Sequence, residues 1–278
     1  MLVDLHTHSN ASDGVLAPEQ LLARAEKNGV ELLALTDHDT MHGVQALQQG
    51  LASGTLQVSL QLVPGAEITS LCGGRCVHIV GLWLDAGSSE LQGLLAGQRQ
   101  VREERAERIA HKLAGQGVEH AYQGALQHAG SAAVSRPHFA RYLVEQGHCA
   151  TEQQAFKRWL GKGKVADVAC AWPQLERVVS VIQAAGGLAV LAHPLKYGLT
   201  RTRLTDLLAQ FAAAGGEAVE LVSGAQPQAA TRDLLQLCQR QGLACSSGSD
   251  FHSPAQTWCD IGRQPALPEA ATAVWELR

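Results

Sequence analysis

The chain opens with the sequence Leu2-Val3-Asp4-Leu5-His6-Thr7-His8-Ser9, in which a short apolar run ends in two histidines one residue apart. Side chains alternate between the two faces of a β-strand, so His6 and His8 are expected to point the same way. Two imidazoles on one face can bind the same metal ion. The stretch therefore predicts a buried strand whose carboxyl end carries metal ligands.

The same order of an apolar run, a polar cluster and a helical pattern recurs along the chain. Further short runs rich in valine, isoleucine and leucine lie at 32–35, 60–63, 77–82, 188–191, 218–222 and 243–245. Helical periodicity fills most of the intervals, at 18–27, 43–49, 173–185, 204–214 and 228–241. Between 60 and 82, the pattern instead predicts adjacent strands joined by a turn at Cys72–Cys76.

Repeated β-then-α units predict an α/β fold in which helices cover a parallel sheet. About seven strands predict a closed or nearly closed barrel, although periodicity alone also allows a doubly wound open sheet. Residues from 96 to 165 break this rhythm with several helical patterns, of which 98–112 is densely charged. We therefore expect a barrel domain formed by 1–95 and 166–278, and a helical insertion at 96–165 that contributes substrate contacts.

The composition limits the classes of function. With a net charge of −4 at pH 7, the chain lacks the broad positive field that drives nonspecific binding of nucleic acid. No stretch approaches the roughly 18 apolar residues of a membrane span, and the N-terminal segment lacks the features of a secretory signal. Seven scattered cysteines favour reduced thiols over a disulfide framework, and Cys72 and Cys76 have no second cysteine pair to complete a zinc knuckle. We expect a cytoplasmic protein with no membrane and no obligate protein partner.

Histidines and carboxylates gather at the predicted strand ends. They are His6, His8, Asp13, His38, Glu67, His78, His193, Asp250 and His252. The carboxyl ends of parallel barrel strands converge, so we expect these side chains to share one site. Six histidines and three carboxylates exceed the roughly four to six ligands of one ion, and they suit two or three divalent ions with Glu67 as the bridge. The mixed donors favour Mn²⁺, with Zn²⁺ or Fe²⁺ as alternatives, over an oxygen-only Mg²⁺ site.

Several of these residues stand in short motifs. In order, the motifs are His6-Thr7-His8-Ser9, Thr36-Asp37-His38-Asp39, Glu67, His78, His193-Pro194 and Gly248-Ser249-Asp250-Phe251-His252. On these motifs the chain resembles the PHP (polymerase and histidinol phosphatase) superfamily, and in particular freestanding bacterial members that act on phosphate esters of nucleotides or short RNA. The resemblance implies a distorted, TIM-like (β/α)7 barrel with a trinuclear metal site.

The resemblance also implies a ligand set for each ion. The first ion would be held by His6, His8, Glu67 and Asp250, the second by Glu67, His78 and His193, and the third by Asp13, His38 and His252. Some family members have histidine where this chain has Asp13, which leaves the identity and occupancy of the third ion open.

A phosphate ester suits this predicted site. Three divalent ions would outweigh the charge of three carboxylates, and coordination lowers the pKa of water towards about 7. We therefore predict a metal-dependent phosphoesterase that hydrolyses a phosphate monoester of a small nucleotide, such as a nucleoside 3′,5′-bisphosphate, by attack of a metal-activated hydroxide, with Asp250 essential for catalysis. The alternatives are a 5′→3′ exonuclease on short RNA oligonucleotides, an amidohydrolase-type C–N hydrolase and a noncatalytic metal-stabilised module.

Residues outside the metal ligands are expected to select the phosphorylated substrate. In Ser135-Arg136-Pro137-His138, the proline favours the start of a helix, whose N-terminus, serine hydroxyl and guanidinium would bind a phosphate. His138 would either bind phosphate or protonate the leaving oxygen, and the sequence does not separate these two roles. Lys164 and Lys196 are further candidates for substrate binding. The alternative for all of them is an exposed side chain with no part in the site.

Overall fold

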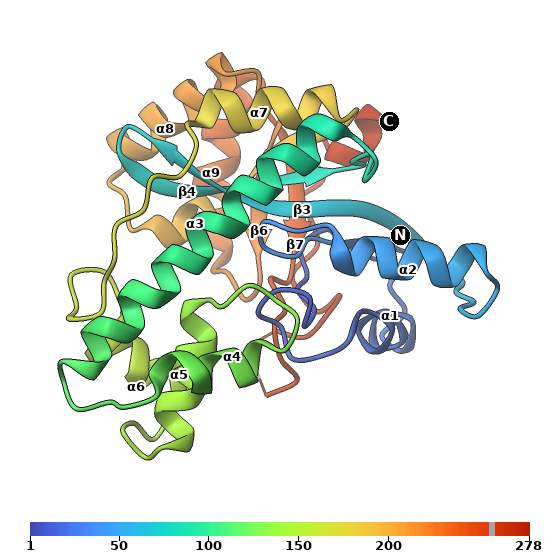
Figure 1. Cartoon of the computed structure of the whole chain (residues 1–278). Coiled ribbons are helices and arrows are strands. Elements are labelled where there is room, and N and C mark those ends of the chain that lie inside the picture. Colours follow the sequence, from blue (N-terminus) through green and yellow to red (C-terminus); the bar gives the residue numbers. More distant parts are fainter. Residues whose placement is uncertain (256–258) are drawn as a thin grey trace. The chain divides into compact units, whose positions relative to one another are not determined.

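The computed structural model of the chain describes residues 1–255 and 259–278, which divide into two compact units (Figure 1). The first unit joins Met1–Leu95 to Trp172–Arg278, and the second is Ala96–Ala171. The strands of the first unit are β1 (Val3–Asp4), β2 (Leu32–Leu35), β3 (Gln61–Cys72), β4 (Arg75–Leu82), β5 (Leu188–Leu191), β6 (Ala218–Ser223) and β7 (Ala244–Gly248). Its helices are α1 (Pro18–Lys27), α2 (His42–Ala52), the start of α3 (Ser89–Ala114), α7 (Leu175–Ala184), α8 (Arg201–Ala213) and α9 (Gln228–Gln241), with short 3-10 turns at Pro194–Tyr197 and Val274–Leu277.

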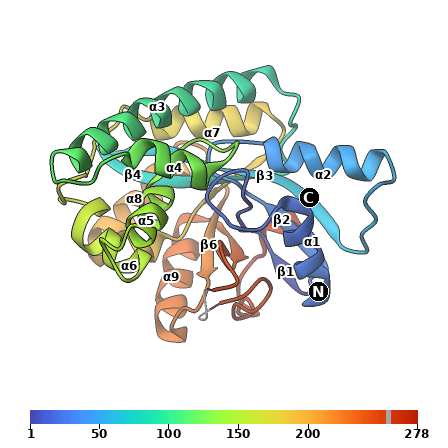
Figure 2. The ribbon, with the colours of Figure 1, turned by 60° about the horizontal axis from the view of Figure 1, so that its bottom comes forward.

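The strands form one sheet in the order in which they occur in the chain (Figure 2). β1, β2 and β3 are parallel, β4 runs antiparallel to both β3 and β5, and β5, β6 and β7 are again parallel. The segments after β1 and β7 also meet, because the N–H of Leu5 donates to the carbonyl of Ser247 at 3.0 Å and that of Asp250 to the carbonyl of His6 at 2.9 Å. The sheet is therefore a nearly closed, distorted barrel, which confirms the predicted fold and excludes the open sheet.

β3 continues well beyond residue 63, where its apolar run ends. It pairs with β2 as far as Pro64 and with β4 from Gly65 onwards. A Cβ at position 65 would lie 2.8 Å from the carbonyl oxygen of Gly81, so glycine allows the close approach of the new partner. A change of pairing partner lets one strand run through both residues, and the predicted adjacent strands joined by a turn at Cys72–Cys76 are confirmed. Glu67 consequently lies within a strand.

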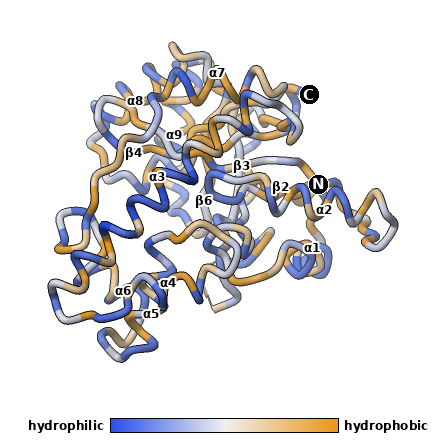
Figure 3. Tube along the Cα trace, viewed as in Figure 1, coloured by the Kyte–Doolittle hydropathy of each residue, from blue (hydrophilic) through white to orange (hydrophobic). Residues whose placement is uncertain are grey.

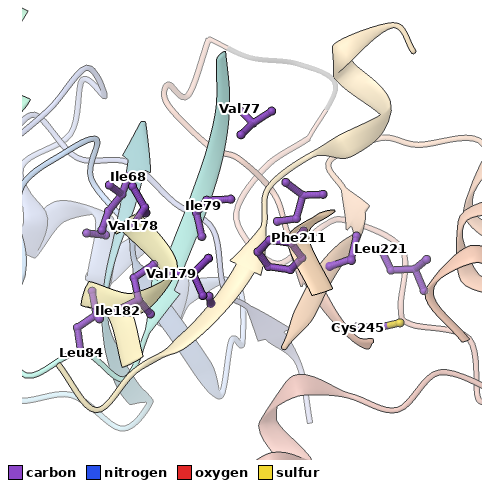
Figure 4. Close-up of a cluster of buried hydrophobic side chains, with 14 of the residues drawn as sticks. Ile68, Val77, Ile79, Leu84, Val178, Val179, Ile182, Phe211, Leu221 and Cys245 are labelled. Carbon is purple, nitrogen blue, oxygen red and sulfur yellow. The ribbon is translucent and has the colours of Figure 1, made fainter. Parts of the chain in front are cut away.

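Both faces of the sheet are covered. β2 is buried at all four of its positions, as is expected for a parallel strand with helices outside and side chains within the barrel. Leu33 and Leu35 belong to the apolar layer between sheet and helices, whereas Leu32 and Ala34 belong to a smaller cluster inside the barrel. The outer layer combines strand and helix side chains, some of which are drawn in Figure 4: Ile68, Ile79, Val178, Val179 and Phe211.

The ends of two elements differ from the apolar pattern for local reasons. α8 begins at Arg201, three residues before the predicted start, because the hydroxyl of Thr200 accepts the N–H of Arg203 at 3.5 Å and caps the helix. β7 extends to Gly248, beyond the predicted 245, because Ser246 and Ser247 are buried although they are polar. A search for apolar runs misses strand residues of this kind.

The second unit is helical and has its own core. It contains the remainder of α3, α4 (Ala121–Ala129), α5 (Arg136–Glu145) and α6 (Glu152–Ala155), which continues into a π-helical turn at Phe156–Leu160. Its core includes Ile109, Leu113, Phe139, Leu143 and Trp159. Ala166 and Val168 are buried in the same core, so this unit runs to Ala171 and ends later than the expected 165.

α3 is the longest described helix, and Figure 3 shows hydrophilic residues along most of it. This agrees with the dense charge predicted for 98–112. In the part of the chain that the structure describes, no helix has both the length and the apolar character needed to cross a membrane.

Candidate metal centre

All nine histidines and carboxylates singled out in the sequence lie in the described part of the first unit. Glu67 and His78 lie within strands, whereas the others follow strands: His6, His8 and Asp13 after β1, His38 after β2, His193 after β5, and Asp250 and His252 after β7. Ligand atoms that lie within 4.8 Å of one another form three groups: His6, His8, Glu67 and Asp250; His38, Glu67 and His78; and His8, Asp13, His38 and His252. The first group has the same members as the set that the resemblance implies for the first ion.

The other two groups differ slightly from the implied ligand sets. His38 stands with Glu67 and His78, where the resemblance implies His193, and His8 joins the group around Asp13. His193 nevertheless reaches the site, because its Nε2 lies 2.8 Å from Glu67 Oε1. Which histidine serves which ion therefore stays a prediction.

Glu67 stands at the centre of the site. Its side chain is fully buried, and imidazole nitrogens surround both of its oxygens. Oε2 lies 3.1 Å from His6 Nε2, 3.2 Å from His8 Nε2 and 3.1 Å from His38 Nδ1. Oε1 lies 2.8 Å from both His78 Nδ1 and His193 Nε2. A carboxylate in this position is suited to bridge two cations, as expected for Glu67.

Asp250 and Asp13 complete the carboxylate set. Asp250 Oδ1 lies 3.3 Å from His8 Nε2 and 3.6 Å from His252 Nδ1, and Asp13 Oδ1 lies 3.5 Å from His252 Nε2. The other oxygen of Asp250, Oδ2, accepts a hydrogen bond from Lys196 Nζ at 2.6 Å. The lysine predicted to bind substrate therefore contacts a predicted metal ligand.

The donor atoms of the site fit divalent metal ions. Several buried atoms have no hydrogen-bond partner among the described residues: His6 Nε2, His8 Nδ1 and Nε2, His38 Nδ1 and Glu67 Oε2. Buried polar atoms without a partner cost free energy, and coordination of a cation would satisfy those that face the centre. Imidazole and carboxylate donors together suit first-row transition metals. The residues present therefore fit the metals that the sequence predicts.

The electrostatics of the site keep its carboxylates ionised. Burial would raise the pKa of Glu67 and Asp250, but the neighbouring imidazoles hold both pKa values well below the usual range. Burial acts to lower the pKa of His8, yet the carboxylates of Asp250 and Glu67, 3.3 and 3.2 Å from its Nε2, outweigh it and raise that pKa to about 9. For His78 the charge of Glu67 likewise outweighs burial and raises the pKa to about 10.

Metal binding is expected to release protons and to strengthen as the pH rises. In the metal-free protein the raised pKa values of His8 and His78 mean that both rings carry an extra proton at neutral pH. A ring must lose that proton to bind metal, so the apparent Kd for Mn²⁺ falls as the pH rises towards the pKa values of about 9 and 10. Calorimetric titrations at neutral pH in two buffers of different ionisation enthalpy measure the release. A Kd that is constant with pH, without proton release, would contradict the expectation.

Buried carboxylates outside the predicted ligand set hold the loops of the site. Asp37 accepts the backbone N–H and the hydroxyl of Ser9, both at 2.7 Å. Asp39 accepts the backbone N–H of Thr69 at 2.7 Å and its hydroxyl at 2.8 Å. Sequence reasoning gave these two aspartates no role. The available signal was their position on either side of His38.

Asp4 has a similar function between the two ends of the sheet. It accepts the backbone N–H of Ser249 at 2.9 Å and that of Gly262 at 2.8 Å, and burial raises its pKa to about 6. It therefore connects β1 to the segment that leads into Asp250.

Asp250 and His193 both have left-handed backbone conformations, with φ values of 53° and 30°, which cost roughly 1–3 kcal/mol each. Such strained residues persist where the surrounding hydrogen bonds hold them.

The other predicted substrate residues belong to the second unit. Ser135 is the N-cap of α5, and its backbone N–H and hydroxyl lie 3.0 and 3.1 Å from His138 Nδ1. Nδ1 accepts the backbone N–H, so a neutral His138 has its proton on Nε2. The guanidinium of Arg136 stacks 5.9 Å from the ring centre of Phe156, and Lys164 is exposed in the turn that follows the π-helix. The roles of these residues stay predictions.

Comparison with known proteins places the chain among phosphoesterases. The PHP domain family matches residues 4–125. A 5′-3′ exoribonuclease from Haemophilus influenzae is 40% identical over 273 residues, which cover 98% of this chain and 97% of the relative. A 3′,5′-nucleoside bisphosphate phosphatase from Chromobacterium violaceum is 36% identical over 274 residues, which cover 98% of this chain and 95% of the relative.

Two solved structures are also similar. The first is an amidohydrolase from Chromobacterium violaceum with bound sulfate and no metal. It superposes on this chain with a TM-score of 0.91 at 35% identity, and the match covers 100% of this chain and 95% of the amidohydrolase chain. A protein from Bifidobacterium adolescentis, provisionally assigned as a metal-dependent phosphoesterase, gives a TM-score of 0.80 at 26% identity over 99% of this chain and 94% of its own. With its motifs, its barrel and relatives of this similarity, the chain belongs to the PHP domain family and is a metal-dependent phosphoesterase.

Proposed function

We propose that this enzyme removes the 3′-phosphate from a nucleoside 3′,5′-bisphosphate. The observation that carries the proposal is the buried carboxylate of Glu67 with five imidazoles around it, next to Asp250 and Asp13. When bound, divalent ions at these residues would activate water and neutralise the oxygens of a phosphate. We propose Mn²⁺ as the metal, because mixed imidazole and carboxylate donors suit it.

Residues outside the metal ligands would orient the phosphate ester. Lys196 is 49% exposed and places an ammonium group beside Asp250, where it would contact a phosphate oxygen. Neutral His138, with its hydrogen on Nε2, would donate a hydrogen bond to the substrate. As a general acid, the imidazolium form would give its Nε2 proton to the leaving O3′ and become neutral. Arg136 and Ser135, at the first turn of α5, and the exposed Lys164 would bind the 5′-phosphate.

The second candidate is 5′→3′ exonuclease activity on short RNA. A relative named for that activity is 40% identical to this chain, and the relative named as a bisphosphate phosphatase is 36% identical. Both reactions break the bond between O3′ of a 5′-phosphorylated nucleotide and phosphorus, and both release a nucleoside 5′-monophosphate. They differ only in whether phosphorus carries a further nucleotide.

Product analysis with purified protein and Mn²⁺ separates the candidates. The substrates are adenosine 3′,5′-bisphosphate, a 5′-phosphorylated RNA trimer and the same trimer with a 5′-hydroxyl. We expect the highest kcat/KM with the bisphosphate and release of orthophosphate. A higher kcat/KM with the trimer would favour the exonuclease. Because one similar structure is that of an amidohydrolase, an amide and a lactone are included, and activity on these alone would overturn the proposal.

Arg136→Ala is expected to raise KM for the bisphosphate about 10- to 100-fold with little change in kcat. The guanidinium would bind the nonreacting 5′-phosphate, and a hydrogen bond to a charged group is worth about 1.5–3 kcal/mol. Arg99→Ala is the matched control, because Arg99 is an exposed arginine of the same unit that pairs with Glu103 at 3.0 Å. Equal KM values for the two variants would show that Arg136 does not bind the 5′-phosphate.

We also propose that the protein is cytoplasmic. None of the seven cysteines, all of which the structure describes, forms a disulfide, which suits the reducing cytoplasm. Fractionation of cells that express the chain at its natural level would check this.

A further inference from the structure

A further buried carboxylate, Glu220 in β6, lies against the candidate metal centre. Its side chain is 2% exposed, and none of the motifs quoted above contains it. Its Oε2 lies 3.2 Å from Nδ1 of His6 and accepts the backbone N–H of His193 at 2.6 Å. One oxygen atom thus contacts two residues that are far apart in the sequence, His6 after β1 and His193 after β5.

The fold aims Glu220 into the barrel. Along β6, Ala218 belongs to the inner cluster and Val219 to the outer apolar layer, so the next residue points inwards again. A register shift between β6 and β7 follows at once, between Glu220 and Val222. Bulges of this kind often re-aim side chains beside functional sites.

Glycine at position 248 leaves room for this contact. A Cβ there would lie 3.0 Å from Glu220 Oε1 and 2.3 Å from the Cβ of His6. Both distances are too short for a side chain larger than hydrogen. The contact between Glu220 and His6 therefore favours glycine at position 248. The glutamate and the histidine are packed together by the sheet itself.

The contact determines which nitrogen of His6 is available to a metal. A carboxylate only accepts hydrogen bonds, so a neutral His6 that donates to Glu220 keeps its hydrogen on Nδ1 and leaves the lone pair of Nε2 for a metal. Nε2 is the atom that lies 3.1 Å from Glu67 Oε2, on the side of the candidate centre. His193, whose N–H the same oxygen accepts, approaches the other oxygen of Glu67 at 2.8 Å.

We propose that Glu220 is a positioning residue of the metal centre, which orients His6 through Nδ1 and His193 through its backbone N–H towards the two oxygens of Glu67. This inference rests on the proposed metal centre but not on the identity of the substrate. Carboxylates that hold the second nitrogen of a ligand histidine typically change metal affinity about 10- to 100-fold when they are replaced.

The test measures Mn²⁺ binding to the full chain after removal of metal with a chelator. We expect Glu220→Gln to weaken binding about tenfold and Glu220→Leu, which keeps the volume but removes every acceptor, about 100-fold. The matched control is Glu217→Gln, since Glu217 accepts the backbone N–H of Ala189 at 2.7 Å and its other hydrogen bond among the described residues is with Gln183. The control should bind Mn²⁺ as the unmodified chain does.

Thermal unfolding of the metal-free and Mn²⁺-saturated forms separates positioning from general stability. Glu220→Gln should melt like the control without metal and gain less stability from Mn²⁺. If Glu220→Gln binds Mn²⁺ with the same Kd as the control, the inference is wrong, even if Glu220→Leu fails to fold. If the unmodified chain itself binds no Mn²⁺, the proposed metal centre fails instead.

Discussion

Replacement of Glu67 by glutamine is expected to lower turnover of the phosphate ester at least about 1,000-fold. Metal ions contribute several kcal/mol to the stabilisation of a transition state, and about 4 kcal/mol corresponds to a factor of about 1,000. Glu67 contributes to two of the three groups of ligand atoms. Glutamine keeps the size of the side chain but removes the negative charge and one of the two oxygen donors.

Metal analysis shows whether the loss arises at the metal centre. We expect the Glu67→Gln chain to retain at most about one ion, because the group of His8, Asp13, His38 and His252 does not include Glu67. Glu217→Gln controls for the loss of a carboxylate that accepts a backbone N–H of the sheet away from the site. Full metal content together with turnover within tenfold of the control would show that Glu67 is not a bridging ligand.

Asp250→Ala is expected to abolish turnover as well, with a smaller loss of metal. Asp250 belongs to one of the three groups of ligand atoms, so its removal should cost about one ion per chain. The surrounding histidines hold the pKa of its carboxyl well below the usual range, and the negative charge is therefore present throughout the neutral pH range. Its loss would remove charge that balances a bound cation.

A second variant separates this effect from the loss of the ion pair with Lys196. Lys196→Met removes the 2.6 Å contact with Asp250 but leaves the carboxylate in place. Lys196 is half exposed, and exposed ion pairs contribute at most about 1 kcal/mol, so we expect full metal content and stability within that range. Phosphate release and metal content are measured for both variants. An equal loss of metal in the two variants would show that the ion pair, and not a ligand role of the carboxylate, explains the Asp250 result.

The fold and the composition of the site could be predicted from the sequence because both depend on local patterns. A period of two along a strand places His6 and His8 on one face whatever the rest of the chain does. Repeated strand and helix units require a covered parallel sheet, and the ends of such strands meet. The histidines and carboxylates that follow these strands were therefore expected in one place, where the structure brings them together.

The supporting carboxylates and some of the boundaries could not be predicted. β3 runs through Pro64 and Gly65 because β4 replaces β2 as its partner. The residues of β3 alone do not predict where this change of partner occurs. The helical unit continues past 165 because Ala166 and Val168 are buried in its core. These features depend on which segments pack against each other.

The sequence by itself thus determined the α/β class of the fold and the chemical nature of the donors, since each follows from neighbours a few residues apart. Only the tertiary structure decided how those donors are held. Glu220 is 214 residues from His6 and 27 from His193, and its role depends on the closure of the sheet. A glutamate within an apolar strand has no local pattern that identifies its partner. Hydrogen bonds between distant segments exist only once the barrel has formed, so the alignment of the site is a property of the folded chain.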